Sequence, residues 1–282
     1  MINKSIVLNN GLQIPSLGFG TYKAADDRST EVIRMAIEAG YRYFDTASFY
    51  ETEGYLADAI KECGVPREKL TIASKVWRSE MGYENTKKAF SQTLERLQTD
   101  YLDLYLIHWP RPLENENNWK MADCETWHAM EELYREGKVR AIGLSNFLPH
   151  HIENIMTVAT VFPAVNQIEF HPGYTQSETV KYCQERKIAV QAWSPMGRGR
   201  VLQDALILEL SEKYNVTPAQ ICMRYCLQHN VMPLPKASSQ ARMNENKDVW
   251  EFTISDDDMN KIDAMPETGW SGEHPDRDRV PQ

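Results

Sequence analysis

Four ionisable side chains lie at or just after the ends of three strand-like segments that follow one another in the chain. Asp45 ends the first segment, Lys75 and His108 occupy matching places in the next two, and Tyr50 follows Asp45 by five residues. A phenol titrates near pH ~10, and a nearby ammonium lowers that pKa while an aspartate keeps the ammonium charged. An imidazole can orient a carbonyl oxygen beside the phenol. These residue types indicate protonation of a carbonyl oxygen, with a hydride that only a cofactor can supply.

Taken singly, each of these residues could have a purely structural role or serve a different reaction. A buried Lys–Asp pair is often only an ion pair, and a histidine at a strand end is often hydrogen-bonded scaffold. Lys75 with Asp45 could also serve a lyase or isomerase, in which Lys75 forms a Schiff base with the substrate. Trapping of substrate on Lys75 with borohydride would favour that alternative. The convergence of all four groups favours a shared reductive site.

Short β-branched or aromatic segments alternate with amphipathic segments along the chain, as in a parallel α/β fold. Strands are predicted at 16–22, 42–47, 70–76, 101–109, 139–145, 164–170, 188–194 and 231–237. Helices are predicted at 30–39, 85–97 and 205–214 from their apolar periodicity. Two more helices are expected to begin at Pro149 and at Pro218, the latter behind Thr217 as its N-cap.

Eight strand–helix units favour one (β/α)₈ TIM barrel, of the α/β class, over residues 1–282, with 205–214 as an extra helix. Residues 5–14 are predicted to form a hairpin that turns at Asn10-Gly11 and closes one end of the barrel. The alternative is a doubly wound open sheet with a G-x-G-x-x-G turn, which neither Gly18-Phe19-Gly20 nor the glycines after Met196 complete. In a barrel the carboxyl ends of the strands carry the site, which would bring Asp45, Lys75 and His108 together.

The amino-acid composition indicates a folded protein without a membrane span or a nucleic-acid partner. The chain has 282 residues, 42% of them hydrophobic, and a net charge of -9. This balance excludes a disordered chain and argues against a nucleic-acid partner. No apolar run of about 18 residues indicates a membrane span. The chain begins with strand-like sequence and has five scattered cysteines, so we expect a cytoplasmic protein.

The cysteines and histidines of the sequence give no indication of a metal site. Cys222 and Cys226 are four residues apart on a predicted helix, where we interpret them as small buried apolar side chains. The seven histidines show no H-E-x-x-H spacing, so no metal site is expected. No unpaired apolar helix face stands out, and a monomer with a small-molecule carbonyl substrate is predicted.

Four motifs occur in an order that is similar to the aldo-keto reductase family across nearly the whole chain. They are GLQIPSLGFGT at 11–21, GYRYFDTA at 40–47 followed by Tyr50, YLDLYLIHWP at 101–110 and GLSNF at 143–147. The resemblance is to bacterial members of the aldose and 2,5-diketo-gluconate reductase type. It implies NADPH-dependent carbonyl reduction in which Tyr50 is the general acid and His108 orients the carbonyl. The Asp45–Lys75 pair would then tune the tyrosine.

The same resemblance implies a cofactor site. Ser145, Asn146 and Gln167 match positions that hold the nicotinamide carboxamide, and Trp193 matches an aromatic position, often tyrosine, that stacks on the nicotinamide. Ser194, Pro195, Met196 and Gly197 match the loop that covers the pyrophosphate of the cofactor. Positions that match the adenosine end are Lys236, Ser238, Ser239, Arg242 and Asn246. The remaining cofactor positions lie at the first two strands and are Gly20, Thr21, Tyr22 and Asp45.

Cofactor preference is predicted from charge. Arg242 could pair with a 2′-phosphate, which favours NADPH with some use of NADH. Ala237 stands where many relatives have a serine on that phosphate, and Ser238 or Ser239 could substitute for it.

Aromatic residues are expected at the substrate mouth. The substrate pocket would be lined by Tyr22, Phe49, Trp77 and Trp109, beside Tyr50 and His108. It would suit a small or medium aldehyde or ketone, and residues 266–282 would form its variable wall.

A second class of function on the same barrel is a cofactor-binding regulatory subunit. Oxidation of NADPH with a simple aldehyde would exclude the lyase or isomerase alternative.

Overall fold

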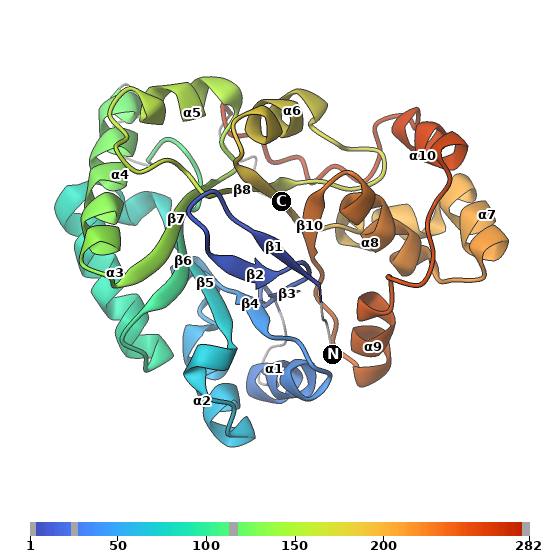
Figure 1. Cartoon of the computed structure of the whole chain (residues 1–282), viewed down its shortest axis with the longest axis horizontal. Coiled ribbons are helices and arrows are strands. Elements are labelled where there is room, and N and C mark those ends of the chain that lie inside the picture. The colour runs from blue at the N-terminus through green and yellow to red at the C-terminus, as the bar shows by residue number, and fades with distance from the viewer. Residues whose placement is uncertain (1–3, 24–27, 113–117, 278–282) are drawn as a thin grey trace.

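Eight parallel strands lie side by side in the order in which they occur in the chain. The structure, a computed structural model, describes residues 4–23, 28–112 and 118–277, and the arrangement of the strands can be followed in Figure 1. The strands are β3 (Phe19–Gly20), β4 (Tyr43–Asp45), β5 (Thr71–Val76), β6 (Leu102–Ile107), β7 (Val139–Ser145), β8 (Val165–Glu169), β9 (Ala189–Trp193) and β10 (Val231–Leu234). The order has no reversal, so the doubly wound alternative is excluded and the (β/α)₈ barrel is confirmed.

The barrel closes between its first and last strands through a sparse seam. The Gly18 N–H donates to the Pro233 carbonyl at 3.2 Å, and the Gly20 N–H donates to the Pro235 carbonyl at 3.0 Å. Because proline has no N–H, the last strand cannot donate in return at these two residues. This explains why β3 and β10 are shorter than the predicted strands 16–22 and 231–237.

An antiparallel hairpin, β1 (Ser5–Val7) with β2 (Gln13–Pro15), lies across one end of the barrel (Figure 1). Leu8 and Ile14 pack into the barrel interior together with Tyr43, Leu104 and other buried side chains. The prediction that a hairpin closes the barrel is confirmed. Its loop is wider than a two-residue Asn10-Gly11 turn, since the Leu8 N–H donates to the Leu12 carbonyl at 2.9 Å.

Helices surround the strands (Figure 1). They are α1 (Ser29–Glu38), α2 (Glu53–Cys63), α3 (Tyr83–Leu97), α4 (Trp119–Arg135), α5 (Pro149–Met156), α6 (Ser177–Glu185), α7 (Ala205–Tyr214), α8 (Pro218–Gln228), α9 (Gln240–Lys247) and α10 (Asp256–Asp263). The predicted extra helix is α7, between β9 and α8. Cys222 and Cys226 are fully buried in α8, as predicted. Among the described residues, no helix has the length and apolar character to cross a membrane.

Candidate active site

The four predicted site residues come together at the carboxyl end of the barrel. Asp45 ends β4, Lys75 lies near the end of β5, and His108 directly follows β6. Tyr50 ends a short 3₁₀ turn, η1 (Ser48–Tyr50), that follows β4. Parallel strands present their carboxyl ends on one rim, so residues far apart in the sequence meet there.

The Lys75 ammonium is surrounded by acceptors. Its Nζ lies 2.7 Å from Asp45 Oδ2, 3.0 Å from the Thr46 carbonyl oxygen and 3.3 Å from Tyr50 Oη. An ammonium has three N–H donors, so each of them has an acceptor. Tyr50 Oη therefore accepts a hydrogen bond from Lys75 and keeps its own proton for another partner. His108 Nε2 lies 3.3 Å from the same oxygen.

Burial and charge act in opposite directions on Lys75. The side chain has no exposed surface, and this burial lowers the pKa of Lys75, while the Asp45 carboxylate opposes the shift. The Asp45 carboxylate favours the charged ammonium, and an ammonium 3.3 Å from Tyr50 Oη favours the phenolate form of the tyrosine. The geometry can therefore stabilise negative charge on Tyr50 Oη and return a proton to it.

A chain of amides holds the second oxygen of Asp45. Gln167 Nε2 donates to Asp45 Oδ1 at 2.7 Å and lies 3.2 Å from Gln191 Oε1. Gln191 Nε2 in turn lies 2.9 Å from Tyr43 Oη, and all four side chains are buried. Both carboxylate oxygens of Asp45 are thus occupied, which fixes the anion that faces Lys75.

A cavity of about 710 Å³ opens beside Tyr50 and His108. Most of the predicted cofactor and substrate residues line it: Gly20, Tyr22, Asp45, Phe49, Tyr50, His108, Trp109, Ser145, Asn146, Gln167, Trp193, Ser194, Pro195, Met196, Lys236, Ser238, Arg242 and Asn246. The volume falls within the usual range for small-molecule and cofactor sites.

Four predicted residues, Thr21, Trp77, Gly197 and Ser239, are not among the described residues that line the cavity. Thr21 is buried, and its hydroxyl donates to the Asp45 carbonyl at 3.0 Å. Gly197 is buried at the start of η5 (Gly197–Gln203). Ser239 is the N-cap of α9, and Trp77 stacks on Phe49 with ring centroids 3.9 Å apart.

Several lining residues were not predicted. Lys23, Arg198, Glu245 and Glu273 bring charge to the cavity, and Arg198 pairs with Glu273 at 2.9 Å. This ion pair joins η5 to the C-terminal segment that was predicted as a variable wall. The remaining lining residues are Gly199, Leu202, Ala219, Leu234 and Ala237. Both further cations adjoin a predicted position in the sequence, because Lys23 directly follows Tyr22 and Arg198 directly follows Gly197.

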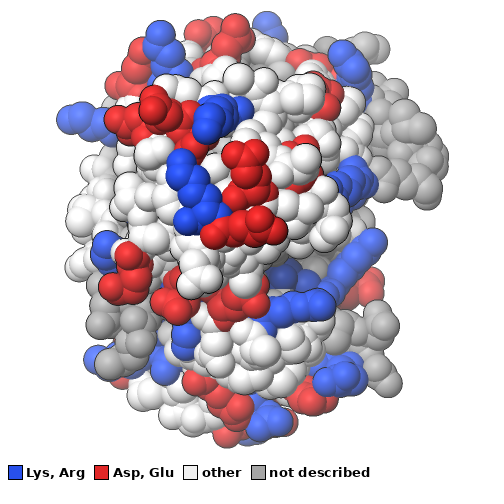
Figure 2. All heavy atoms as spheres, turned by 90° about the vertical axis from the view of Figure 1, so that its right-hand side faces the viewer, with Lys and Arg blue, Asp and Glu red and all other residues white. Residues whose placement is uncertain are grey.

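The lining suits a nicotinamide dinucleotide phosphate. Lys23, Arg198, Lys236 and Arg242 supply cations for phosphate groups, and Trp193 offers a flat ring near the Tyr50 end. Gly20 lies at the edge of the cavity and allows β3 to approach β10 closely, because a Cβ there would lie 3.3 Å from the Leu234 carbonyl oxygen. Figure 2 shows Lys and Arg side chains beside a hollow on the face that carries α7 to α10, amid acidic side chains.

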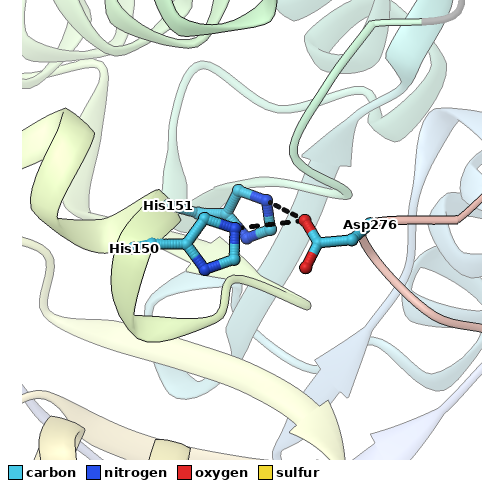
Figure 3. A group of neighbouring side chains, drawn as sticks. All are labelled: His150, His151 and Asp276. Carbon is cyan, nitrogen blue, oxygen red and sulfur yellow. Dashed lines mark hydrogen bonds and ion pairs between the residues drawn. The ribbon is translucent and has the colours of Figure 1, made fainter.

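A second cluster, of His150, His151 and Asp276, lies at the start of α5 (Figure 3). Asp276 Oδ1 is 3.1 Å from His150 Nε2 and 2.9 Å from His151 Nε2. However, His151 Nδ1 accepts the Leu148 N–H at 3.1 Å, so the neutral ring carries its proton on Nε2. Burial and the neighbouring His150 lower the pKa of His151 to about 3. This tautomer disfavours metal ligation, and the cluster instead holds the C-terminal segment against α5.

The barrel with the cluster around Tyr50 at its carboxyl rim is the arrangement expected of an α/β-barrel oxidoreductase that acts on carbonyl compounds. A family model described as the aldo/keto reductase family matches residues 16–267. The chain is 44% identical to glyoxal reductase of Bacillus subtilis over 98% of this chain and 97% of that one. The chain belongs to the aldo/keto reductase family.

Solved structures agree with this assignment. An aldo/keto reductase from Brucella melitensis is similar with a TM-score of 0.86 and 38% identity, covering 92% of this chain and 98% of that one. A Bombyx mori aldo-keto reductase solved in complex with NADP has a TM-score of 0.86 and 31% identity, covering 93% of this chain and 92% of that one.

Proposed function

We propose that the protein reduces aldehydes or ketones to alcohols with NADPH, and that Tyr50 delivers the proton. The observation that carries this proposal is the position of Tyr50 Oη, at 3.3 Å from both Lys75 Nζ and His108 Nε2. All three groups lie at one end of a cavity large enough for a cofactor and a small substrate.

A bound nicotinamide cofactor would supply the hydride, which no side chain can provide. Ser145, Asn146 and Gln167 would hold its carboxamide, and Trp193 would stack on its ring. Lys236, Ser238, Arg242 and Asn246 would hold the adenosine end. The NADP complex of the Bombyx mori relative supports this choice of cofactor. The cations Lys236 and Arg242 support a preference for the 2′-phosphate of NADPH, with some use of NADH.

Four side chains position the carbonyl group and supply its proton. His108 orients the carbonyl oxygen towards Tyr50, and the phenol gives that oxygen its proton as the carbonyl carbon receives the hydride. The C=O group thus becomes CH–OH. Lys75 stabilises the phenolate left behind, and Asp45 keeps Lys75 charged and in place.

The substrate would enter past aromatic rings. Tyr22 and Phe49 are 42% and 43% exposed at the cavity, whereas Trp109 is buried beside them. The rings of Tyr22 and Tyr50 lie 4.9 Å apart, so a carbonyl group at Tyr50 would contact this wall. The glyoxal reductase relative supports small aldehydes, including dicarbonyl compounds, as the substrate class.

The lyase alternative fits the cavity poorly. Lys75 is fully buried and is not among the described residues that line the cavity. A Schiff base requires the amine to reach the substrate, so this placement disfavours Lys75 as a nucleophile.

The test is a spectrophotometric panel of aldehydes, ketones and sugar acids with NADPH and with NADH. We expect oxidation of NADPH with at least one small aldehyde and a lower kcat/KM with NADH. Equal or better turnover with NADH would contradict the cofactor preference, and no turnover with any carbonyl compound would contradict the reductase.

Monomeric state and cytoplasmic location stay predictions. Size-exclusion chromatography with light scattering tests the first, since a monomer has a mass of 32.5 kDa. Fractionation of the producing cells tests the second.

A further inference from the structure

Trp193 does more than present a flat ring to the cavity. Its indole Nε1–H donates to Asn146 Oδ1 at 2.7 Å, across the carboxyl ends of β9 and β7. The other end of the same amide, Asn146 Nδ2, donates to the His108 carbonyl at 2.9 Å and lies 3.1 Å from Ser145 Oγ. A continuous chain of hydrogen bonds therefore joins Trp193 to the backbone of His108.

This chain determines which way the Asn146 amide faces. An indole nitrogen can only donate, and a backbone carbonyl can only accept, so the two neighbours require opposite ends of the amide. The backbone supports the same arrangement, because Asn146 adopts a left-handed conformation with φ of 64° and its N–H donates to the Gln167 carbonyl at 2.8 Å. Asn146 is 7% exposed, so water cannot readily replace a lost partner.

We infer that Trp193 is a positioning residue whose indole N–H orients the Asn146 amide for the nicotinamide carboxamide and holds the backbone of His108. This inference rests on the proposed function. It also separates tryptophan from tyrosine at this position: a phenol carries its donor at the far tip of its ring, so it cannot make this bond from the ring edge. Two aromatic residues that offer a similar flat face would thus differ in how firmly they fix the amide.

The test removes the N–H and keeps an aromatic ring at position 193. Trp193 is replaced by phenylalanine, and separately by benzothienylalanine, which has the same bicyclic shape with sulfur in place of the N–H. We expect the benzothienylalanine variant to bind NADPH roughly five- to tenfold more weakly, the effect of losing one buried hydrogen bond, and the phenylalanine variant to lose at least as much because its ring is also smaller. Affinity for adenosine 2′,5′-bisphosphate, which lacks the nicotinamide, should be unchanged. Both affinities are measured by titration of the protein without substrate.

Hydride transfer gives the second readout. With a deuterium label at nicotinamide C4, both variants should show a lower kcat and a larger primary isotope effect than the wild type, since a less well oriented nicotinamide makes transfer slower. Trp119→Phe is the matched control, because the Trp119 ring lies against His151, 5.1 Å away between centroids, and should change neither readout.

Three results would overturn the inference. They are unchanged NADPH affinity in the benzothienylalanine variant, an equal loss of affinity for both ligands, and an unchanged isotope effect. Failure of the proposed function is recognised separately, because the wild type would then bind NADPH without reducing any aldehyde or would not bind it at all.

Discussion

Asp123 shows how burial can outweigh a hydrogen bond and neighbouring cations in their effect on the pKa of a carboxyl group. It lies in α4 with no exposed surface, its Oδ1 accepts the Arg111 N–H at 3.0 Å, and burial raises the pKa of Asp123 to about 8. In the unfolded chain this carboxyl ionises near pH ~4. The folded protein therefore binds the proton more tightly, and the stability that this gives is complete below pH ~4 and is lost as the pH rises towards 8.

Replacement of Asp123 with asparagine should remove this pH dependence while keeping the acceptor for Arg111. We expect the free energy of unfolding of Asp123→Asn to rise relative to wild type by about 1–4 kcal/mol between pH 5 and pH 8. Urea unfolding at several pH values measures it. Parallel curves for the two proteins would show that Asp123 is ionised in the folded state.

Residue types and order were enough to predict that Asp45, Tyr50, Lys75 and His108 meet. Three of them stand at strand ends that a barrel brings to one rim, and Tyr50 follows one of these ends in η1. The cations Arg198 and Lys23 could not be predicted in the same way. Arg198 reaches the cavity only through the left-handed conformation of η5, with φ of 56°, and through its pairing with Glu273, 75 residues away. Neither feature leaves a periodic pattern in the sequence.

At the scale of elements, local signals predicted five of the ten described helices, α1, α3, α5, α7 and α8. Thr217 caps α8: its hydroxyl accepts the Gln220 N–H at 3.3 Å, and Gln220 Oε1 accepts the Thr217 N–H at 2.8 Å. Pro218 follows at the first helical position. The ends of the strands were less predictable. β10 ends before Pro235, which has no N–H to donate to β3, and the length of β3 depends on the same few hydrogen bonds between these two strands.

The cap on α8 gives a prediction of its own. Thr217→Ala should lower the free energy of unfolding by about 1 kcal/mol, because the helix loses a side-chain acceptor for an N–H in its first turn. Thr217→Ser keeps the hydroxyl and serves as the control. The two are compared by urea unfolding, and equal stability of the alanine and serine variants would show that the cap contributes nothing measurable.

At the scale of the whole molecule, the barrel depends on close approach of neighbouring strands. Gly143 in β7 faces β8, and a Cβ at Gly143 would lie 2.6 Å from the Val165 carbonyl oxygen and 2.8 Å from Leu106 Cδ2. A backbone carbonyl cannot move aside as a flexible side chain can. The strand order was predictable from alternation of segments, whereas this contact depends on the final packing of β6, β7 and β8.

Gly143→Ala should therefore separate β7 from β8 and lower the free energy of unfolding by about 1–3 kcal/mol, or prevent folding. Gly54→Ala in α2 is the matched control, because nothing lies within 4 Å of its added Cβ, and it should cause no loss of stability. Thermal and urea unfolding measure both variants. A Gly143→Ala protein as stable as the control would contradict the close approach of these strands.

Carbonyl reduction by this barrel, as proposed, depends on Tyr50 as the proton donor. The most direct measurement is a single-turnover reduction of a small aldehyde by Tyr50→Phe with NADPH, together with the dissociation constant for NADPH. We predict a rate lower by about 10²- to 10⁴-fold with NADPH affinity nearly unchanged. A variant that reduces the aldehyde at the wild-type rate would contradict the assignment of Tyr50 and the function proposed from it.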